Sequence, residues 1–188
     1  MADSDLNKKI NNTKKILSQE TLIKILKQLT NAFCYMQKIG IAHRDIKPGN
    51  IFMINDNYYI GDFEQSIKVK LNNTEEEIKG TEAFLSPLLF NALIRNNKKV
   101  KHNIFKSDVY SFGLCFIYAL TKNIYFLQKI KEVKQGDKIK QFILDNLIEK
   151  KIELNHNFFE IIIKMVTWDE RNRPDFIELN ELIKEKIS

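Results

Sequence analysis

The segment HRDIKPGN, residues 43–50, places a carboxylate, an ammonium group and an amide on one short loop. Asp45 and Asn50 are five positions apart, and Lys47 lies between them. Asp62, beyond a predicted hairpin, supplies a second oxygen ligand beside Asn50. Oxygen ligands suit Mg²⁺, and a lysine offsets the charge of a phosphoryl group in transfer. The pattern predicts phosphoryl transfer. A loop of turn-forming residues is the simpler alternative, but it does not account for His-Arg-Asp ahead of Lys-Pro.

Two elements are predicted to hold this loop in place. Residues 18–39 carry apolar side chains at helical spacing, with Ser18 as the N-cap and Gly40 as the C-terminal stop. After the loop, IFMI at 51–54 and YYIG at 58–61 are separated by a turn-prone Asn-Asp-Asn. This arrangement predicts a short β-hairpin directly after the loop.

The rest of the chain is predicted to be mainly helical. Residues 62–88 show no sustained periodicity, so we expect an ordered but irregular segment there. Apolar or amphipathic helices are predicted at 106–121, 136–150, 157–166 and 175–187. No internal repeat or low-complexity linker interrupts the sequence, and 188 residues suit one domain. The predicted fold class is mainly α, a helical bundle with one small β-hairpin.

Composition narrows the cellular setting. The net charge of +6 comes from lysines scattered along predicted helices, which indicates solvated faces and no nucleic-acid partner. The longest apolar stretch, residues 109–120, is too short to span a bilayer, and the first residues lack the apolar core of a signal peptide. Cys34 and Cys115 lie in apolar runs, which favours buried free thiols in a reducing compartment. We therefore expect a soluble cytoplasmic protein without a membrane partner.

Five motifs resemble, in order, those of the eukaryotic protein kinase family, and together they cover nearly the whole chain. They are HRDIKPGN at 43–50, GDFE at 61–64, GTEAFLSPL at 80–88, SDVYSFG at 107–113 and RNRP at 171–174. Five ordered motifs are more specific than any single one. The resemblance implies that residues 1–188 form the C-terminal lobe of a protein kinase domain. Its catalytic loop would be 43–50 and its activation segment 62–88. Other phosphotransferases also use an aspartate-to-asparagine loop, but they lack the G-T…S-P segment.

The resemblance also implies roles for the chemical residues. Asp45 would accept or orient the proton of a substrate hydroxyl, and Lys47 would contact the γ-phosphate of ATP. Asn50 and Asp62 would hold Mg²⁺, and Phe52 would form the floor under the adenine ring. The expected reaction transfers the γ-phosphate to Ser or Thr hydroxyls of a protein substrate, because the Lys-Pro pair resembles the serine/threonine branch.

Four further residues would support these groups. His43 is expected to pack against Phe63 rather than to act as an acid or base. Thr81 would bond the catalytic aspartate and lysine, and Asp108 would orient the main chain of the His-Arg pair. These contacts would be architectural rather than chemical.

The sequence departs from the family pattern in three places. No glycine-rich loop, strand lysine or partner glutamate precedes the hinge-like start, so we expect the N-terminal β lobe to be absent and the chain alone to have little activity. Glu64 replaces a glycine, where a left-handed conformation would cost roughly 1–2 kcal/mol. Leu88 replaces the glutamate that pairs with Arg173 in the family, so Arg173 needs another acceptor, such as Glu82, or must reach solvent.

Two functions stay open from the sequence. The first is a serine/threonine protein kinase lobe, favoured by the four intact chemical residues. The second is an impaired, pseudokinase-like interaction lobe or an incomplete gene product, favoured by the three departures. In either case an apolar lobe face would be exposed, and a partner that covers it is expected.

Regulation is predicted at the arginine before the catalytic aspartate. The resemblance implies that Arg44 binds a phosphate on the activation segment, with Thr74 as the candidate phosphosite. Acidic residues follow Thr74 directly, so we hypothesise that the carboxylate of Glu76 or Glu77 approaches Arg44 without any modification. A solvated acidic loop tip is the alternative.

Overall fold

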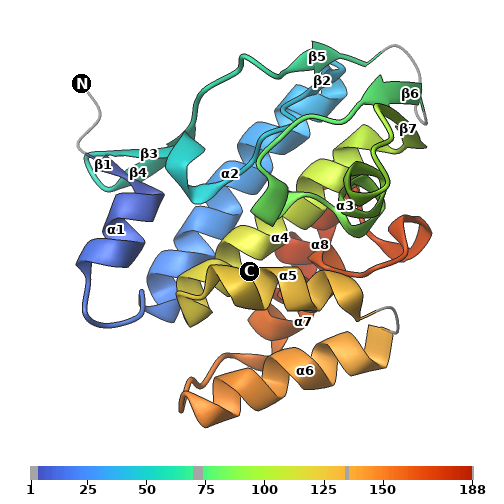
Figure 1. The fold of residues 1–188 in the computed structure, drawn as a ribbon. Coiled ribbons are helices and arrows are strands. Elements are labelled where there is room, and N and C mark those ends of the chain that lie inside the picture. The colour runs from blue at the N-terminus through green and yellow to red at the C-terminus, as the bar shows by residue number, and fades with distance from the viewer. Residues whose placement is uncertain (1–3, 70–73, 134–135, 188) are drawn as a thin grey trace.

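The computed structural model describes residues 4–69, 74–133 and 136–187 of the chain. In Figure 1 three small sheets lie along one side of a helical body, and helix α6 lies at the opposite side. The helices are α1 (Leu6–Asn12), α2 (Gln19–Lys38), α3 (Pro87–Ile94), α4 (Ile104–Thr121), α5 (Ile124–Glu132), α6 (Gly136–Glu149), α7 (His156–Met165) and α8 (Phe176–Lys186). The predicted class, mainly α with little sheet, is confirmed.

The strands are short, and every pairing between them is antiparallel. They are β1 (Ser4–Asp5), β2 (Ile41–Ala42), β3 (Ile51–Ile54), β4 (Asn57–Ile60), β5 (Ile67–Lys68), β6 (Thr74–Glu77) and β7 (Lys99–His102). Strands β1, β3 and β4 form one sheet, β2 pairs with β5, and β6 pairs with β7. Single turns of 3₁₀ helix lie at η1 (Pro48–Asn50), η2 (Glu82–Phe84) and η3 (Glu170–Asn172).

Helix α2 forms where the sequence predicts it. The Ser18 hydroxyl accepts the Thr21 main-chain N–H, which caps the first turn, and Gly40 follows the last turn with φ of 76°. One face of the helix is buried, and it carries Leu22, Ile25, Leu26, Leu29 and Phe33. The Phe33 ring stacks on Phe176 of α8 with 4.6 Å between centroids, so the two helices share one core.

Helix α4 is the central helix of the body, and almost all its residues are buried. It approaches α7 closely at Gly113. A Cβ atom there would lie 2.7 Å from Cγ1 of Val166 and 2.9 Å from Cβ of Met165, so no larger residue fits without moving α7. Among the described residues no helix is long and apolar enough to cross a membrane.

The remaining sequence expectations are met unevenly. The hairpin is present as β3 and β4, with Asn55 and Asp56 at positive φ in its turn. Cys34 and Cys115 are buried free thiols, as expected. The helices predicted after residue 105 are present within two residues of their predicted bounds. Residues 62–88 are more regular than predicted, because they include β5, β6, η2 and the start of α3.

Strands β6 and β7 were not predicted because β6 is almost wholly acidic and β7 contains one apolar residue, Val100. Their pairing places Glu75 opposite Lys101 and Glu77 opposite Lys99. Opposite charges in facing cross-strand positions stabilise a ladder, whereas the alternation of apolar residues that marks most strands is missing here. The acidic segment that the sequence suggested as a loop tip is therefore one strand of a small charged sheet.

Candidate active site

The candidate catalytic loop starts between β2 and η1, and the central helix α4 fixes its first residues. The carboxylate of Asp108 accepts the main-chain N–H of His43 at 2.7 Å and that of Arg44 at 2.9 Å. Arg44 has φ of 71°, an uncommon conformation for a side chain of its size, and the two bonds hold it there. Burial raises the pKa of Asp108 to about 7, although both N–H donors act in the opposite direction.

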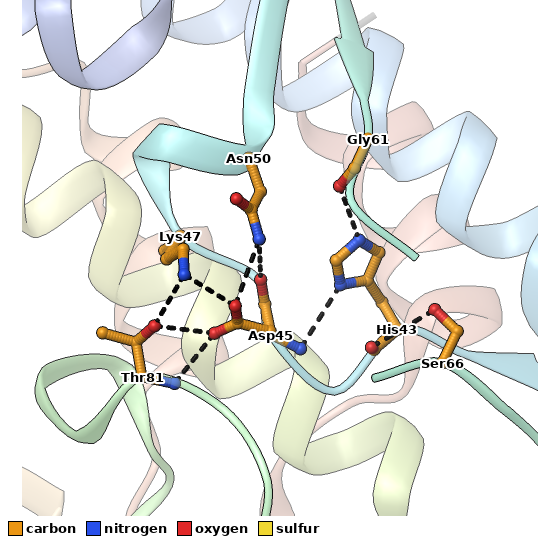
Figure 2. Close-up of polar contacts among 7 residues, drawn as sticks. All are labelled: His43, Asp45, Lys47, Asn50, Gly61, Ser66 and Thr81. Atoms are coloured by element: carbon orange, nitrogen blue, oxygen red, sulfur yellow. Dashed lines mark hydrogen bonds and ion pairs between the residues drawn. The ribbon is translucent and has the colours of Figure 1, made fainter. Parts of the chain in front are cut away.

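Asp45 is the centre of the loop, and its carboxylate accepts hydrogen bonds from four donors (Figure 2). Thr81 donates to Oδ1 through its main-chain N–H and its hydroxyl, both at 2.8 Å. Lys47 Nζ and Asn50 Nδ2 donate to Oδ2 at 2.7 and 3.2 Å. Burial raises the pKa of Asp45, but the bonds from Lys47 and Thr81 outweigh it, and the net pKa lies below its usual value.

Thr81 can approach the loop because Gly80 precedes it. Gly80 has φ of 109°, and a Cβ atom at this position would lie 2.6 Å from the main-chain oxygen of Arg44. Both facts restrict the position to glycine. The Thr81 hydroxyl also accepts a bond from Lys47 Nζ at 2.9 Å, so the expected contacts of Thr81 with the aspartate and the lysine are both present.

The candidate metal ligands Asn50 and Asp62 lie on two adjacent segments of the main chain. The main-chain N–H of Gly61 donates to the main-chain oxygen of Asn50 at 2.9 Å, and this bond brings Asp62 next to the loop. The Asn50 amide nitrogen bonds Asp45, and its Oδ1 points away from that residue (Figure 2). Asp62 is exposed. An amide oxygen and an exposed carboxylate are hard ligands that fit Mg²⁺ shared with phosphate oxygens.

The expectation of strain at Glu64 is wrong. Glu64 is not among the described residues with positive φ, whereas Asp62 has φ of 61°. Asp62 and not Glu64 therefore adopts the left-handed conformation in this segment. An aspartate tolerates that conformation better than a glutamate, because its short side chain bonds locally.

His43 packs between aromatic rings, as expected. Its ring lies 5.2 Å from that of Phe63 and 6.4 Å from that of Phe33, measured between centroids. Nε2 is 3.1 Å from the Gly61 main-chain oxygen, and Nδ1 is 3.3 Å from the Asp45 nitrogen. Burial lowers the pKa of His43, which favours the neutral ring. Phe52 lies in β3 opposite Tyr59, half-buried, and its ring faces Gly61.

Arg173 does not use Glu82 as its acceptor. Arg173 is 2% exposed, and its guanidinium donates to three main-chain oxygens, those of Thr167 at 2.9 Å, Lys106 at 2.9 Å and Trp168 at 3.1 Å. Its Cζ also lies 4.7 Å from the Tyr110 ring centroid. Burial lowers the pKa of Arg173 to about 10. The cage of carbonyl oxygens replaces the carboxylate that the sequence led us to expect.

Arg44 contacts a main-chain oxygen of the activation segment, whereas the sequence predicted contact with a side-chain carboxylate. Its Nη2 donates to the main-chain oxygen of Glu77 at 2.6 Å, while the Glu77 carboxylate pairs with Lys79 at 3.2 Å. Glu77 thus approaches Arg44, but among the described residues no ion pair joins Arg44 to the carboxylate of Glu76 or Glu77, so the expected carboxylate pair is wrong. The main chain of Thr74 pairs with His102, and its side chain lies outside the described atoms.

Sequence reasoning missed two contributors to this region. Strand β7 pairs with the acidic strand, and no local pattern marked it. Lys131 of α5 is buried and bonds the main-chain oxygen of Glu82, the residue after Thr81. A lysine on an amphipathic helix is normally exposed, so the sequence around Lys131 gives no indication that this lysine contacts Glu82.

The family model for the protein kinase domain matches residues 1–184, so the chain belongs to the protein kinase family.

Relatives with kinase names are similar over most of the chain. A protein of Acanthamoeba polyphaga mimivirus assigned to the serine/threonine-protein kinases is 28% identical over 85% of this chain and 55% of its own length. The interferon-induced, double-stranded RNA-activated protein kinase of Rattus norvegicus is 26% identical over 78% of this chain and 30% of its own length. The probable serine/threonine-protein kinase nek2 of Dictyostelium discoideum is 29% identical over 94% of this chain and 40% of its own length. The chain thus spans about half or less of the length of these relatives.

Proposed function

We propose that this chain is the helical, C-terminal lobe of a serine/threonine protein kinase and supplies the residues that act on the substrate hydroxyl. Asp45 would accept or orient the hydroxyl proton, and Lys47 would neutralise charge on the transferred phosphoryl group. The observation that carries the proposal is the Asp45 carboxylate, because Lys47, Asn50 and Thr81 hold it in one orientation.

The donors around Asp45 suggest how the site changes when substrates bind. An ionised carboxylate has about four acceptor positions, and all four are occupied here. A substrate hydroxyl can bond Oδ2 only when a donor leaves it. Lys47 is that donor in our proposal, because its ammonium group would move to the γ-phosphate of ATP. Nucleotide binding would then prepare Asp45 for the protein substrate.

The transfer step itself needs little covalent help from the protein. The hydroxyl oxygen of the substrate forms a bond to the γ-phosphorus, the bond from that phosphorus to the β,γ-bridging oxygen breaks, and ADP leaves. The hydroxyl proton passes to Asp45. Bound Mg²⁺ supplies positive charge to the phosphates, and Asn50 and Asp62 would be its protein ligands.

Other groups would complete the nucleotide site. Phe52 in β3 would underlie the adenine ring, and groups that hold the α- and β-phosphates would come from a lobe outside this sequence. The contacts of Thr81 and the Lys-Pro pair of the loop favour Ser and Thr as acceptors over Tyr. The buried free thiols Cys34 and Cys115 suit a reducing compartment, and we assign the protein to the cytoplasm.

The test is phosphotransfer by the full gene product with Mg²⁺, labelled ATP and a mixture of Ser/Thr peptides. We expect Asp45→Asn to lower kcat by about 10²–10⁴ while ATP affinity changes little, because Asp45 faces the hydroxyl. Asp56→Asn is the matched control, since Asp56 is an exposed turn carboxylate that pairs with Lys24. Normal turnover by Asp45→Asn would refute the assignment.

A second candidate function is a non-catalytic interaction lobe. An open cleft of about 410 Å³ is lined mainly by apolar side chains, and two of them, Ile39 and Phe63, are 44% and 48% exposed. Exposed apolar side chains gathered in a cleft favour contact with another protein surface. Calorimetry with ATP and Mg²⁺ on the full gene product separates the two candidates. Absence of both ATP binding and turnover would favour the interaction lobe.

A further inference from the structure

Helix α5 buries a lysine beside the candidate active site. Lys131 is 2% exposed, its Nζ donates to the main-chain oxygen of Glu82 at 2.7 Å, and the same nitrogen lies 4.4 Å from the ring centroid of Phe90. Trp168 Nε1 donates to the Lys131 main-chain oxygen at 3.3 Å, which holds the helix from the other side. No ion pair of the described residues includes Lys131.

A buried ammonium group lowers the stability of the fold, and the Glu82 carboxylate, which attracts Lys131 but forms no ion pair with it among the described residues, offsets only part of that cost. Burial lowers the pKa of Lys131 to about 8, so close to neutral pH the group is still charged inside the protein. A methionine has a similar length and would fill the same space without this cost. The charge therefore needs an explanation beyond packing.

The acceptor of Lys131 supplies that explanation. Glu82 begins the η2 turn and directly follows Thr81, whose two donors orient Asp45 at 2.8 Å each. Lys47 bonds the Thr81 hydroxyl from the loop side at 2.9 Å. The Thr81–Glu82 dipeptide is thus held between two ammonium groups, one from the catalytic loop and one from α5.

We propose that Lys131 is a positioning residue for phosphotransfer. By holding the Glu82 carbonyl it fixes the main chain of Thr81, and Thr81 in turn fixes the Asp45 carboxylate. The inference rests on the proposed function for its catalytic consequence, but the coupling from α5 to Asp45 is a property of the folded chain.

The first test needs no turnover. Lys131→Met is compared with wild type and with Lys129→Met, which removes an exposed lysine from the same helix. NMR should show amide exchange at Thr81 faster by about tenfold or more in Lys131→Met. Lys129→Met should match wild type in the exchange of the same amide.

The outcomes of this test are decisive in either direction. Wild-type exchange at Thr81 in folded Lys131→Met would overturn the proposal. Where that variant does not fold, Lys131→Gln replaces it, because its uncharged amide is too short to hold the carbonyl equally well, and the same direction of change is expected.

The second test measures catalysis by the full gene product. Lys131→Met should lower kcat by about tenfold or more with KM for ATP within about twofold, and with no loss in the free energy of unfolding. A structural role would instead lower that free energy and leave kcat per folded molecule unchanged. If wild type transfers no phosphate, the proposed function fails, while amide exchange at Thr81 still decides the positioning inference.

Discussion

The carbonyl cage around Arg173 makes a quantitative prediction about stability. In Arg173→Met three partly buried main-chain oxygens lose a charged donor, and each such bond contributes about 1.5–3 kcal/mol. Relief of the buried charge offsets part of this loss, since burying a guanidinium costs several kcal/mol. We expect a net fall of about 3–5 kcal/mol in the free energy of unfolding, a large share of the ~5–15 kcal/mol typical of a whole domain.

The lysine variant distinguishes the cage from a simple need for positive charge. An ammonium group has no planar fork, so it cannot reach three carbonyl oxygens that approach the guanidinium from Lys106, Thr167 and Trp168. Arg173→Lys keeps the cost of a buried charge and loses most of the bonds. We therefore expect it to be at least as unstable as Arg173→Met.

Urea denaturation of the variants, followed by circular dichroism, measures these differences. Arg171→Met is the control, because Arg171 is two positions away, its side chain is 86% exposed and it pairs with Asp169. It should change stability by less than about 1 kcal/mol. The reasoning fails if Arg173→Lys stays within about 1 kcal/mol of wild type.

Three further outcomes are expected. The Tyr110 hydroxyl is buried without a hydrogen-bond partner among the described residues. In the same urea assay, Tyr110→Phe should therefore leave the free energy of unfolding unchanged or raise it by up to about 1 kcal/mol, and a clear fall in that free energy would contradict this reasoning. Asp108 has a folded pKa of about 7 against an ordinary 3.8, so its stabilisation is full below pH 3.8 and lost as pH rises to 7. The stability difference between wild type and Asp108→Asn should therefore fall by roughly 2–4 kcal/mol across that range, and a flat difference would contradict the raised pKa. Lys101→Glu should speed amide exchange in β6 by placing like charges opposite Glu75, and the double variant with Glu75→Lys should restore it; no recovery would exclude the charge pairing.

The sequence predicted those elements whose stabilising contacts are local. Helix α2 was found because its cap, its apolar face and its terminal glycine lie within one segment, and the hairpin because its turn has a recognisable composition. The contacts of Thr81 and Asp108 with the loop were anticipated from the resemblance to kinases, and both are present. Local chemistry and ordered motifs were sufficient for these features.

The missed features depend on partners that local sequence does not identify. Arg173 bonds main-chain oxygens, which every residue carries, so no side chain marked the acceptors. Arg44 likewise bonds the Glu77 main chain, although the carboxylate was the more obvious acceptor. Strand β6 owes its structure to a charged strand distant in sequence, and the burial of Lys131 depends on how α5 packs beside η2.

The carbonyl cage of Arg173 also affects how this sequence can change by descent. Because backbone oxygens satisfy the guanidinium, an acidic residue at position 88 is not needed, and Leu88 there is 41% exposed. The two positions are therefore uncoupled, and substitutions at 88 can accumulate one at a time without a compensating change at 173. The arginine has no such freedom, because the oxygens around it would stay whatever replaced it. Position 173 is thus restricted to arginine, whereas position 88 is free to vary.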